Sequence, residues 1–250
     1  TMLKVPQQGP LTVDFLLQAI VANTKPQTDT RFRACVHYAK VLELCELPGA
    51  IKLKNLQKKP KPGPRAIPTD DAIIKLVDAV RGERYGWCIA AMATFGCRTG
   101  EVPSLQLNDD GTASCLTIKT KLSLPEERTC FAYPGEWIER WDLHNVDIPG
   151  GVRWLSPQSW DAKRSENWVA AWRQWRCRSV FKAISEELTP GFDLYNLRHR
   201  WAMRSIETNI NQSLCAQAMG HSLKEHEQTY HRELKGNTLR AAMARLAEVN

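Results

Sequence analysis

The sequence has no long apolar run. No stretch approaches the roughly 20 consecutive apolar residues that a membrane-spanning helix needs, and the first ten residues, TMLKVPQQGP, lack an apolar core of the secretory kind. Both absences predict an intracellular protein with no membrane segment.

Paired cysteine motifs are also missing. The chain has eight cysteines but no CxxC pair, and several cysteines lie inside apolar runs such as GWCIAAM. These spacings argue against a structural zinc site or a disulfide framework, and we expect reduced thiols in the core. A hydrophobic fraction of 43% is typical of a globular chain, which excludes wholesale disorder.

Acidic residues are absent from two basic segments. Lysine and arginine total 34 against 27 acidic residues, a net charge of +7. Residues 52–65, KLKNLQKKPKPGPR, carry six basic side chains, and residues 171–182, AWRQWRCRSVFK, carry four. This pattern suits a polyanionic partner, although each segment is equally compatible with a solvated surface.

Hydrophobic periodicity predicts a mainly α-helical fold with a small antiparallel β-sheet (α+β). Helices are expected over residues 11–22, 28–47, 70–80 and 85–95, and again through most of the chain beyond residue 160. Two β-rich runs, 114–118 and 128–133, flank a loop that contains lysines. Prolines between residues 57 and 68 indicate a linker, so a domain boundary is expected near residues 58–65.

Three tryptophans, Trp168, Trp172 and Trp175, fall at i, i+4 and i+7 of one expected helix. Such a stripe favours core packing over a base-stacking platform.

Polar side chains concentrate in three boxes. FGCRTGEVPSL places Arg98 between two glycines, with Glu101 three residues later to orient its guanidinium. DLYNLRHRWAMRSI places Arg198 in an apolar helix start, where a buried guanidinium needs a carboxylate or a phosphate as partner. MGHSLKEHEQTYHRE places His221 after the glycine that ends a helix, with Tyr230 nine residues later.

The third box raises the possibility of a metal site. Its histidines, His221, His226 and His231, are spaced by five, which does not align them on one helical face as an i, i+4 spacing would. We therefore expect no metal, and we interpret His226 and His231 as surface or packing residues.

Taken in order, the boxes resemble the tyrosine recombinase (phage integrase) family over roughly residues 64–235. GCRTGE is similar to the first arginine box of that family, LRHRWA to the second, and MGH followed by Tyr230 to the C-terminal box. The phrases PRAIPTDD, ATFGCRTGEV and YNLRHRWA are most similar to cyanobacterial members, including those that excise DNA elements during heterocyst formation.

The resemblance implies a role for each matching residue. Arg98 and Arg198 would bind the scissile phosphate, His221 would donate a hydrogen bond to it, and Tyr230 would be the nucleophile that forms a 3′-phosphotyrosyl link. Glu101 would support Arg98. The family's lysine, which protonates the departing 5′-oxygen, matches Lys119 or Lys121, and Lys121 is preferred because it lies closer to the expected turn.

One position departs from the family pattern. Tyr195 stands where most members have histidine, and a phenol can donate to phosphate but accepts a proton poorly at neutral pH. The residue that takes the proton from Tyr230 is therefore open. His199 directly follows Arg198 in the sequence, so its side chain is expected to point about 100° away from that of Arg198 around the helix. This direction makes His199 a weak candidate for the proton acceptor.

The resemblance also implies an architecture and partners. Residues 1–57 would form part of an all-helical core-binding domain, 58–65 a basic linker, and 66–250 the catalytic domain. The expected partner is double-stranded DNA in the bacterial cytoplasm (nucleoid), bound by a homo-oligomer, the tetrameric synapse, without a cofactor. DNA contacts are expected from six basic residues: Lys58, Lys59, Lys61, Arg65, Arg173 and Arg176. The alternatives are a type IB-like topoisomerase and a DNA-binding relative that has lost catalysis.

Overall fold

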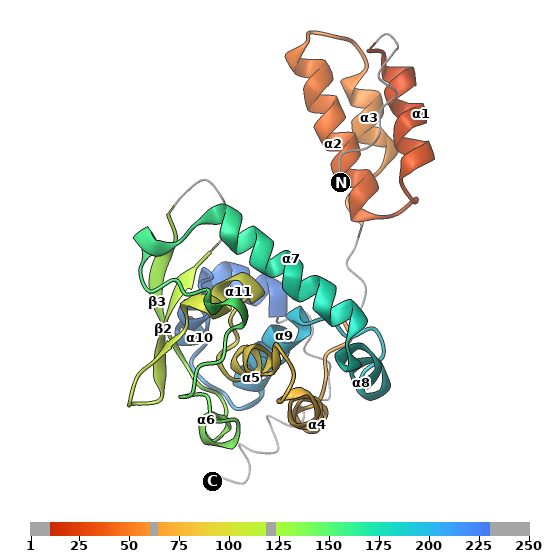
Figure 1. Cartoon of the computed structure of the whole chain (residues 1–250). Coiled ribbons are helices and arrows are strands. Elements are labelled where there is room, and N and C mark those ends of the chain that lie inside the picture. Colours follow the sequence, from red (N-terminus) through yellow and green to blue (C-terminus); the bar gives the residue numbers. More distant parts are fainter. Residues whose placement is uncertain (1–10, 61–64, 119–123, 231–250) are drawn as a thin grey trace, which may run out of the picture. The chain divides into compact units, whose positions relative to one another are not determined.

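The computed structural model of the chain describes residues 11–60, 65–118 and 124–230. The chain divides into two compact units, residues 1–64 and 65–250 (Figure 1). No helix in the described part is both long and apolar enough to span a bilayer.

Residues 11–60 of the first unit form the helices α1 (Val13–Asn23), α2 (Asp29–Leu44) and α3 (Ala50–Leu56). Thr12 and Thr28 cap the first two, each accepting a hydrogen bond from a backbone N–H three residues later. The apolar faces of the three helices form a small core that includes Leu16, Ile20 and Leu53. The periodicity of the sequence did not predict α3. This helix has exposed lysines and buries only Leu53, so it has no clear apolar repeat.

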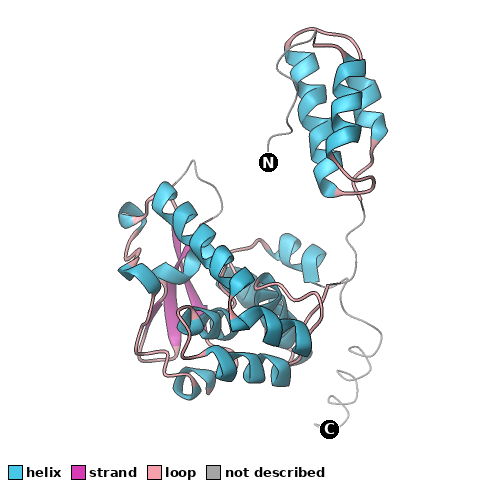
Figure 2. Ribbon diagram, turned by 45° about the vertical axis from the view of Figure 1, so that its right-hand side comes forward, coloured by secondary structure: helices cyan, strands magenta, loops and turns pink. Residues whose placement is uncertain are grey.

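The second unit is mainly helical with one small sheet, which confirms the expected α+β class (Figure 2). Its helices are α4 (Asp70–Val80), α5 (Gly86–Phe95), α6 (Trp137–Arg140), α7 (Ala162–Arg178), α8 (Val180–Leu188), α9 (Tyr195–Glu207), α10 (Gln212–Ala218) and α11 (Leu223–Tyr230). Short 3₁₀ helices are η1 (Thr99–Ser104), η2 (Pro149–Gly151) and η3 (Pro157–Ser159). The strands are β1 (Gln106–Leu107), β2 (Thr112–Thr117) and β3 (Glu126–Phe131).

The sheet is antiparallel in the order β1-β2-β3, one short strand more than the sequence predicted. Cys130 lies opposite Ala113, and Arg128 lies opposite Cys115. Side chains two residues apart on a strand share a face, so Arg128 lies on the same face as the buried Cys130 and Cys115. This face therefore places a charged guanidinium among core residues.

Close packing of α5 against α9 brings the two arginine boxes together. Every residue of α5 is buried. Gly96 ends the helix with a φ of 62°, and a Cβ built there would lie 2.8 Å from the Trp201 ring. The Trp201 indole also donates to the carbonyl of Thr94 at 3.0 Å. Glycine at residue 96 thus provides both the left-handed turn and the room for α9.

A second anchor holds α9 against the start of α4. Arg200 donates two hydrogen bonds of 2.9 Å to the Asp70 carboxylate, and Arg204 donates two more, at 2.7 and 3.0 Å. Burial alone would raise the pKa of Asp70, but the two guanidiniums outweigh it and lower the pKa to about 2.

The tryptophan stripe on α7 is part of the core, as predicted. Trp168 and Trp172 are buried, and the Tyr85 ring stacks on Trp172 with centroids 5.4 Å apart. The eight cysteines are free thiols; six are buried, while Cys45 and Cys177 are exposed.

Candidate active site

Glu101 is the electrostatic centre of the site. It lies in η1, fully buried, and its Oε1 accepts from Arg98 Nη1 at 2.7 Å. Its Oε2 accepts from the Arg98 backbone N–H at 2.8 Å and from Arg128 Nη2 at 2.9 Å. Burial would raise the pKa of Glu101, but Arg128, Arg98 and Arg198 together lower it to about 2. Glu101 is therefore a carboxylate at neutral pH, and it forms an ion pair with Arg98.

This ionisation makes folding stability depend on pH. Because the pKa of Glu101 is lower in the folded state (about 2) than its ordinary 4.5, its contribution is present above about pH 4.5 and is lost as the pH falls towards 2. The contribution is on the order of 3 kcal/mol. In urea unfolding at a series of pH values, Glu101→Gln is expected to show a shallower loss of unfolding free energy across this interval. Equal slopes in the variant and the wild type would contradict this assignment.

Arg198 on α9 is completely buried beside Glu101. Its Nη1 donates to the Gly96 carbonyl at 2.6 Å and its Nη2 to the Met219 carbonyl at 2.5 Å. Glu101 Oε2 lies 4.0 Å from its Nη1, and Arg198 Nε has no hydrogen-bond partner among the described residues. The sequence left open whether a carboxylate or a phosphate is the partner of this guanidinium. A carboxylate, Glu101, lies beside it, and the guanidinium donates most of its hydrogen bonds to backbone carbonyls.

The two arginines converge on the turn that contains the third box. Arg98 Nη1 also lies 3.4 Å from the Met219 carbonyl that Arg198 binds. Gly220 follows with a φ of 64°, and the His221 N–H donates to the Ala216 carbonyl at 2.9 Å, which closes α10 as predicted. His221 Nε2 is 2.8 Å from Arg198 Nη2.

Tyr230 is the last residue of α11 and is 1% exposed. Its ring centroid lies 4.8 Å from that of His226, 5.5 Å from that of His199 and 6.1 Å from that of His221. Burial raises the pKa of Tyr230 to about 12, with Arg198 and Arg65 acting in the opposite direction. Since this phenol holds its proton at neutral pH, nucleophilic attack needs a nearby proton acceptor.

The structure corrects the expectation for His199. Its side chain was expected to project away from the site, but its ring lies against both Tyr230 and Tyr195, and Nδ1 is 3.4 Å from Arg65 Nη1. The reason is that α11 packs on α9 and brings Tyr230 to the face of α9 that carries His199. Arg65 is the first residue of the second compact unit.

His226 is a packing residue, as interpreted. It is fully buried, and its Nε2 is 3.0 Å from Gln212 Oε1. His231 lies outside the described residues. Within the described ranges, no three histidine, cysteine or acidic side chains are grouped so as to hold a metal ion.

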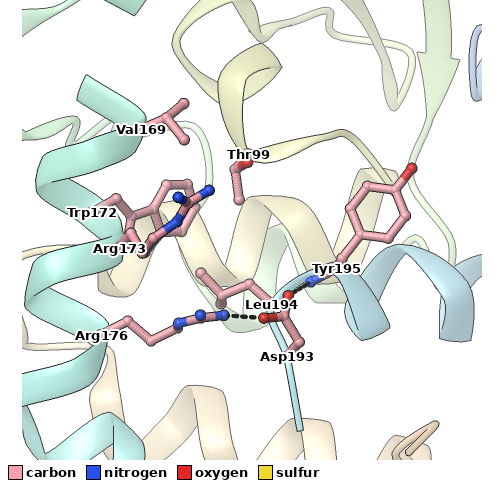
Figure 3. A pocket seen from close by; sticks show the side chains of 8 residues that line it. All are labelled: Thr99, Val169, Trp172, Arg173, Arg176, Asp193, Leu194 and Tyr195. Carbon is pink, nitrogen blue, oxygen red and sulfur yellow. Dashed lines mark hydrogen bonds and ion pairs between the residues drawn. The ribbon is translucent and has the colours of Figure 1, made fainter. Parts of the chain in front are cut away.

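A pocket of about 180 Å³ adjoins the site between α7 and the start of α9 (Figure 3). Thr99 and Tyr195 line one side, and Arg173 and Arg176 on α7 line the other. Arg176 Nη1 forms a 2.5 Å ion pair with Asp193. The two α7 arginines therefore line the same pocket as Tyr195, although the sequence had indicated them only through local charge.

The remaining predicted residues belong to the first unit or lie outside the described residues. Lys58 and Lys59 are exposed in the first unit. Lys61, Lys119 and Lys121 lie outside the described residues, so the expected catalytic lysine is not located. Sequence reasoning also missed Arg128, although the alternation of β3 carries a signal: Cys130 faces inward, so Arg128 must do so too.

The fold is similar to that of a solved integrase and a solved site-specific recombinase. The structure is similar to the Tn1549 transposon integrase (residues 82–397) in complex with circular intermediate DNA, with a TM-score of 0.51 at 14% identity over 93% of this chain and 84% of that one. It is equally similar to the XerH recombinase bound to palindromic difH substrate, with a TM-score of 0.51 at 12% identity over 93% and 69% of the two chains. These likenesses concern the fold.

In sequence, the chain resembles excisases of a cyanobacterium, as its motifs predicted. It is 28% identical to Excisase A of Nostoc sp. (strain PCC 7120) over 205 residues, and 27% identical to Excisase C of the same strain over 196 residues. These alignments cover 73% and 68% of this chain but only 42% and 37% of the two excisases. Residues 1–57 match the family described as the XisA/XisC excisase second domain. The chain thus spans less than half the length of these relatives.

Proposed function

We propose that the protein is a site-specific DNA recombinase that cleaves and rejoins DNA through a 3′-phosphotyrosyl intermediate. The observation that carries the proposal is the convergence of Arg98, Arg198 and His221 on one turn, with the buried Tyr230 against the same cluster. The similarity to the two excisases supports the same activity.

In the proposed reaction Tyr230 Oη attacks the scissile phosphorus, and the bond to the 5′-oxygen breaks. The phenol proton passes to an acceptor at the site, and the departing 5′-oxygen leaves as a hydroxyl after protonation, for which Lys121 or Lys119 is proposed. Arg98 and Arg198 neutralise the charge that builds on the non-bridging oxygens. Because the phosphodiester bond is conserved in the protein–DNA link, a later attack by a 5′-hydroxyl reverses the chemistry without a nucleotide cofactor.

DNA binding is proposed from charge and position. Arg173 and Arg176 line the pocket beside Tyr195, where they can contact phosphates that flank the scissile one (Figure 3). The exposed Lys58 and Lys59, together with Lys61, would add contacts from the first unit and linker. The proposed partners are a DNA duplex and further copies of this chain. Together they would form a homo-oligomeric synapse in the cytoplasm.

Capture of covalent adducts on genomic DNA tests the function whatever the target sequence is. Sheared genomic DNA of the source organism, nicked at random so that short 5′-hydroxyl fragments diffuse away, is incubated with the protein in EDTA. Adducts that resist denaturant are collected and sequenced. We expect adducts at a small set of related sequences, with a 3′-phosphate linked to protein. If none forms, or if adducts need a divalent metal, the proposal fails; adducts without sequence preference indicate a topoisomerase.

A further inference from the structure

Arg128 on β3 joins three parts of the site, none of which lies next to it in the sequence. Its Nη2 donates to Glu101 Oε2 at 2.9 Å, its Nη1 to Thr117 Oγ1 at 3.0 Å, and its Nε to the Ala218 carbonyl at 2.8 Å. Its side chain is only 8% exposed. One guanidinium therefore connects the first arginine box, the end of β2 and the turn before His221.

The ion pair between Arg128 and Glu101 connects this guanidinium to the site as well as to the sheet. Burial would lower the pKa of Arg128, but Glu101 outweighs it and raises that pKa above its ordinary value. Arg128 and Arg98 share the single Glu101 carboxylate, since Oε2 accepts from both. Removing Arg128 therefore removes one of the two groups that fix the position of Oε2, and the orientation of Arg98 depends on that carboxylate.

The same side chain fixes the turn of the third box. Thr117, which accepts from Arg128, also lies against Gly220: a Cβ built on this glycine would be 2.9 Å from Thr117 Oγ1 and 3.4 Å from Arg128 Cδ. The Ala218 carbonyl that accepts from Arg128 Nε is one residue before the Met219 carbonyl to which Arg198 donates. The turn is thus held by Arg128 on one carbonyl and by Arg198 on the next.

From this geometry we infer that Arg128 is a positioning residue for phosphoryl transfer, which holds Glu101 and the 218–221 turn so that Arg98 and His221 address one phosphate. The inference rests on the proposed recombinase function. Arg128 touches no reacting atom, and it acts through the groups that do.

The main test uses Arg128→Met, which keeps much of the side-chain length and removes the charge and the fork. At saturating DNA, using a cleavage site found by adduct capture, we expect the single-turnover cleavage rate to fall about 100-fold. The DNA dissociation constant is expected to stay within about threefold of the wild-type value, because the proposed DNA contacts come from other residues. Arg128→Lys restores charge but not a planar three-way contact, so its rate should remain about tenfold below wild type.

A neutral substrate separates positioning from general destabilisation. Replacing one non-bridging oxygen of the scissile phosphate by a methyl group removes the charge that Arg98 and His221 are arranged to meet. The deficit of Arg128→Met is expected to shrink about tenfold on this methylphosphonate. Arg204→Met is the matched control, because Arg204 is also buried and bound to a carboxylate, Asp70, but lies outside the cluster. Its rate deficit should be the same on both substrates.

A readout without DNA keeps the inference testable if the recombinase function fails. In hydrogen exchange, Arg128→Met should accelerate exchange across residues 216–222 by at least about tenfold relative to its effect on α4, whereas Arg204→Met should not. An unchanged 216–222 segment, a cleavage rate within about threefold of wild type, or an equal deficit on both substrates would overturn the inference. Absence of adducts with the wild-type protein would instead count against the proposed function alone.

Discussion

Tyr230→Phe is expected to abolish formation of the covalent protein–DNA adduct. The change removes only the phenolic oxygen, and the buried ring keeps its contacts with His199, His221 and His226. No phosphotyrosyl bond can form without that oxygen. Adducts on a nicked duplex, resolved by denaturing electrophoresis, should fall below detection while duplex binding remains within about threefold of wild type.

Tyr133→Phe is the matched control for this loss. Tyr133 belongs to the same unit, but its backbone carbonyl accepts from Arg204 and its ring lies under that guanidinium, outside the Tyr230 cluster. Its phenylalanine variant should form adducts at the wild-type rate. Adducts that persist in Tyr230→Phe would show that another residue is the nucleophile.

Arg198→Lys is expected to slow cleavage by about 10³-fold with much less effect on DNA binding. The guanidinium donates to two carbonyls and lies 2.8 Å from His221 Nε2, and a single ammonium cannot reproduce that fork. A buried charge with fewer partners also costs stability, so the melting temperature should fall. Single-turnover cleavage rates, compared with duplex affinity measured on the same protein, separate the two effects.

The control for Arg198→Lys is Arg204→Lys on the same helix. Arg204 is also buried, but its partners are Asp70 and the Tyr133 carbonyl. This variant should also lose stability while its cleavage rate stays within a few-fold of wild type. If the two variants slow cleavage equally, the role of Arg198 at the phosphate is wrong.

Local signals in the sequence predicted much of the second unit. The bounds of α4, Asp70–Val80, agree with the expected 70–80, because a threonine cap, an acidic first turn and a regular apolar face all point the same way. Gly220 and the helix before it could also be predicted from the sequence, since a glycine in the left-handed conformation at a helix end is a local feature. Such elements depend little on distant packing.

Contacts between distant segments account for what the sequence did not show. The position of His199 against Tyr230 depends on α11 packing on α9, which the period of one helix cannot reveal. The second guanidinium that binds the Glu101 carboxylate comes from Arg128, 27 residues away across two strands. The helix α3 was hidden for a different reason: its seven residues bury a single leucine and expose their lysines.

Identification of the residue that carries the DNA is the most direct test of the account. The captured adduct would be digested with trypsin and nuclease, and the nucleotide-bearing peptide sequenced by mass spectrometry. We predict a single modified peptide with a 3′-nucleotide on Tyr230, the last residue of α11. Modification at Tyr195 or any other residue, or the absence of a nucleotide-bearing peptide, would contradict the assignment of Tyr230 as the nucleophile.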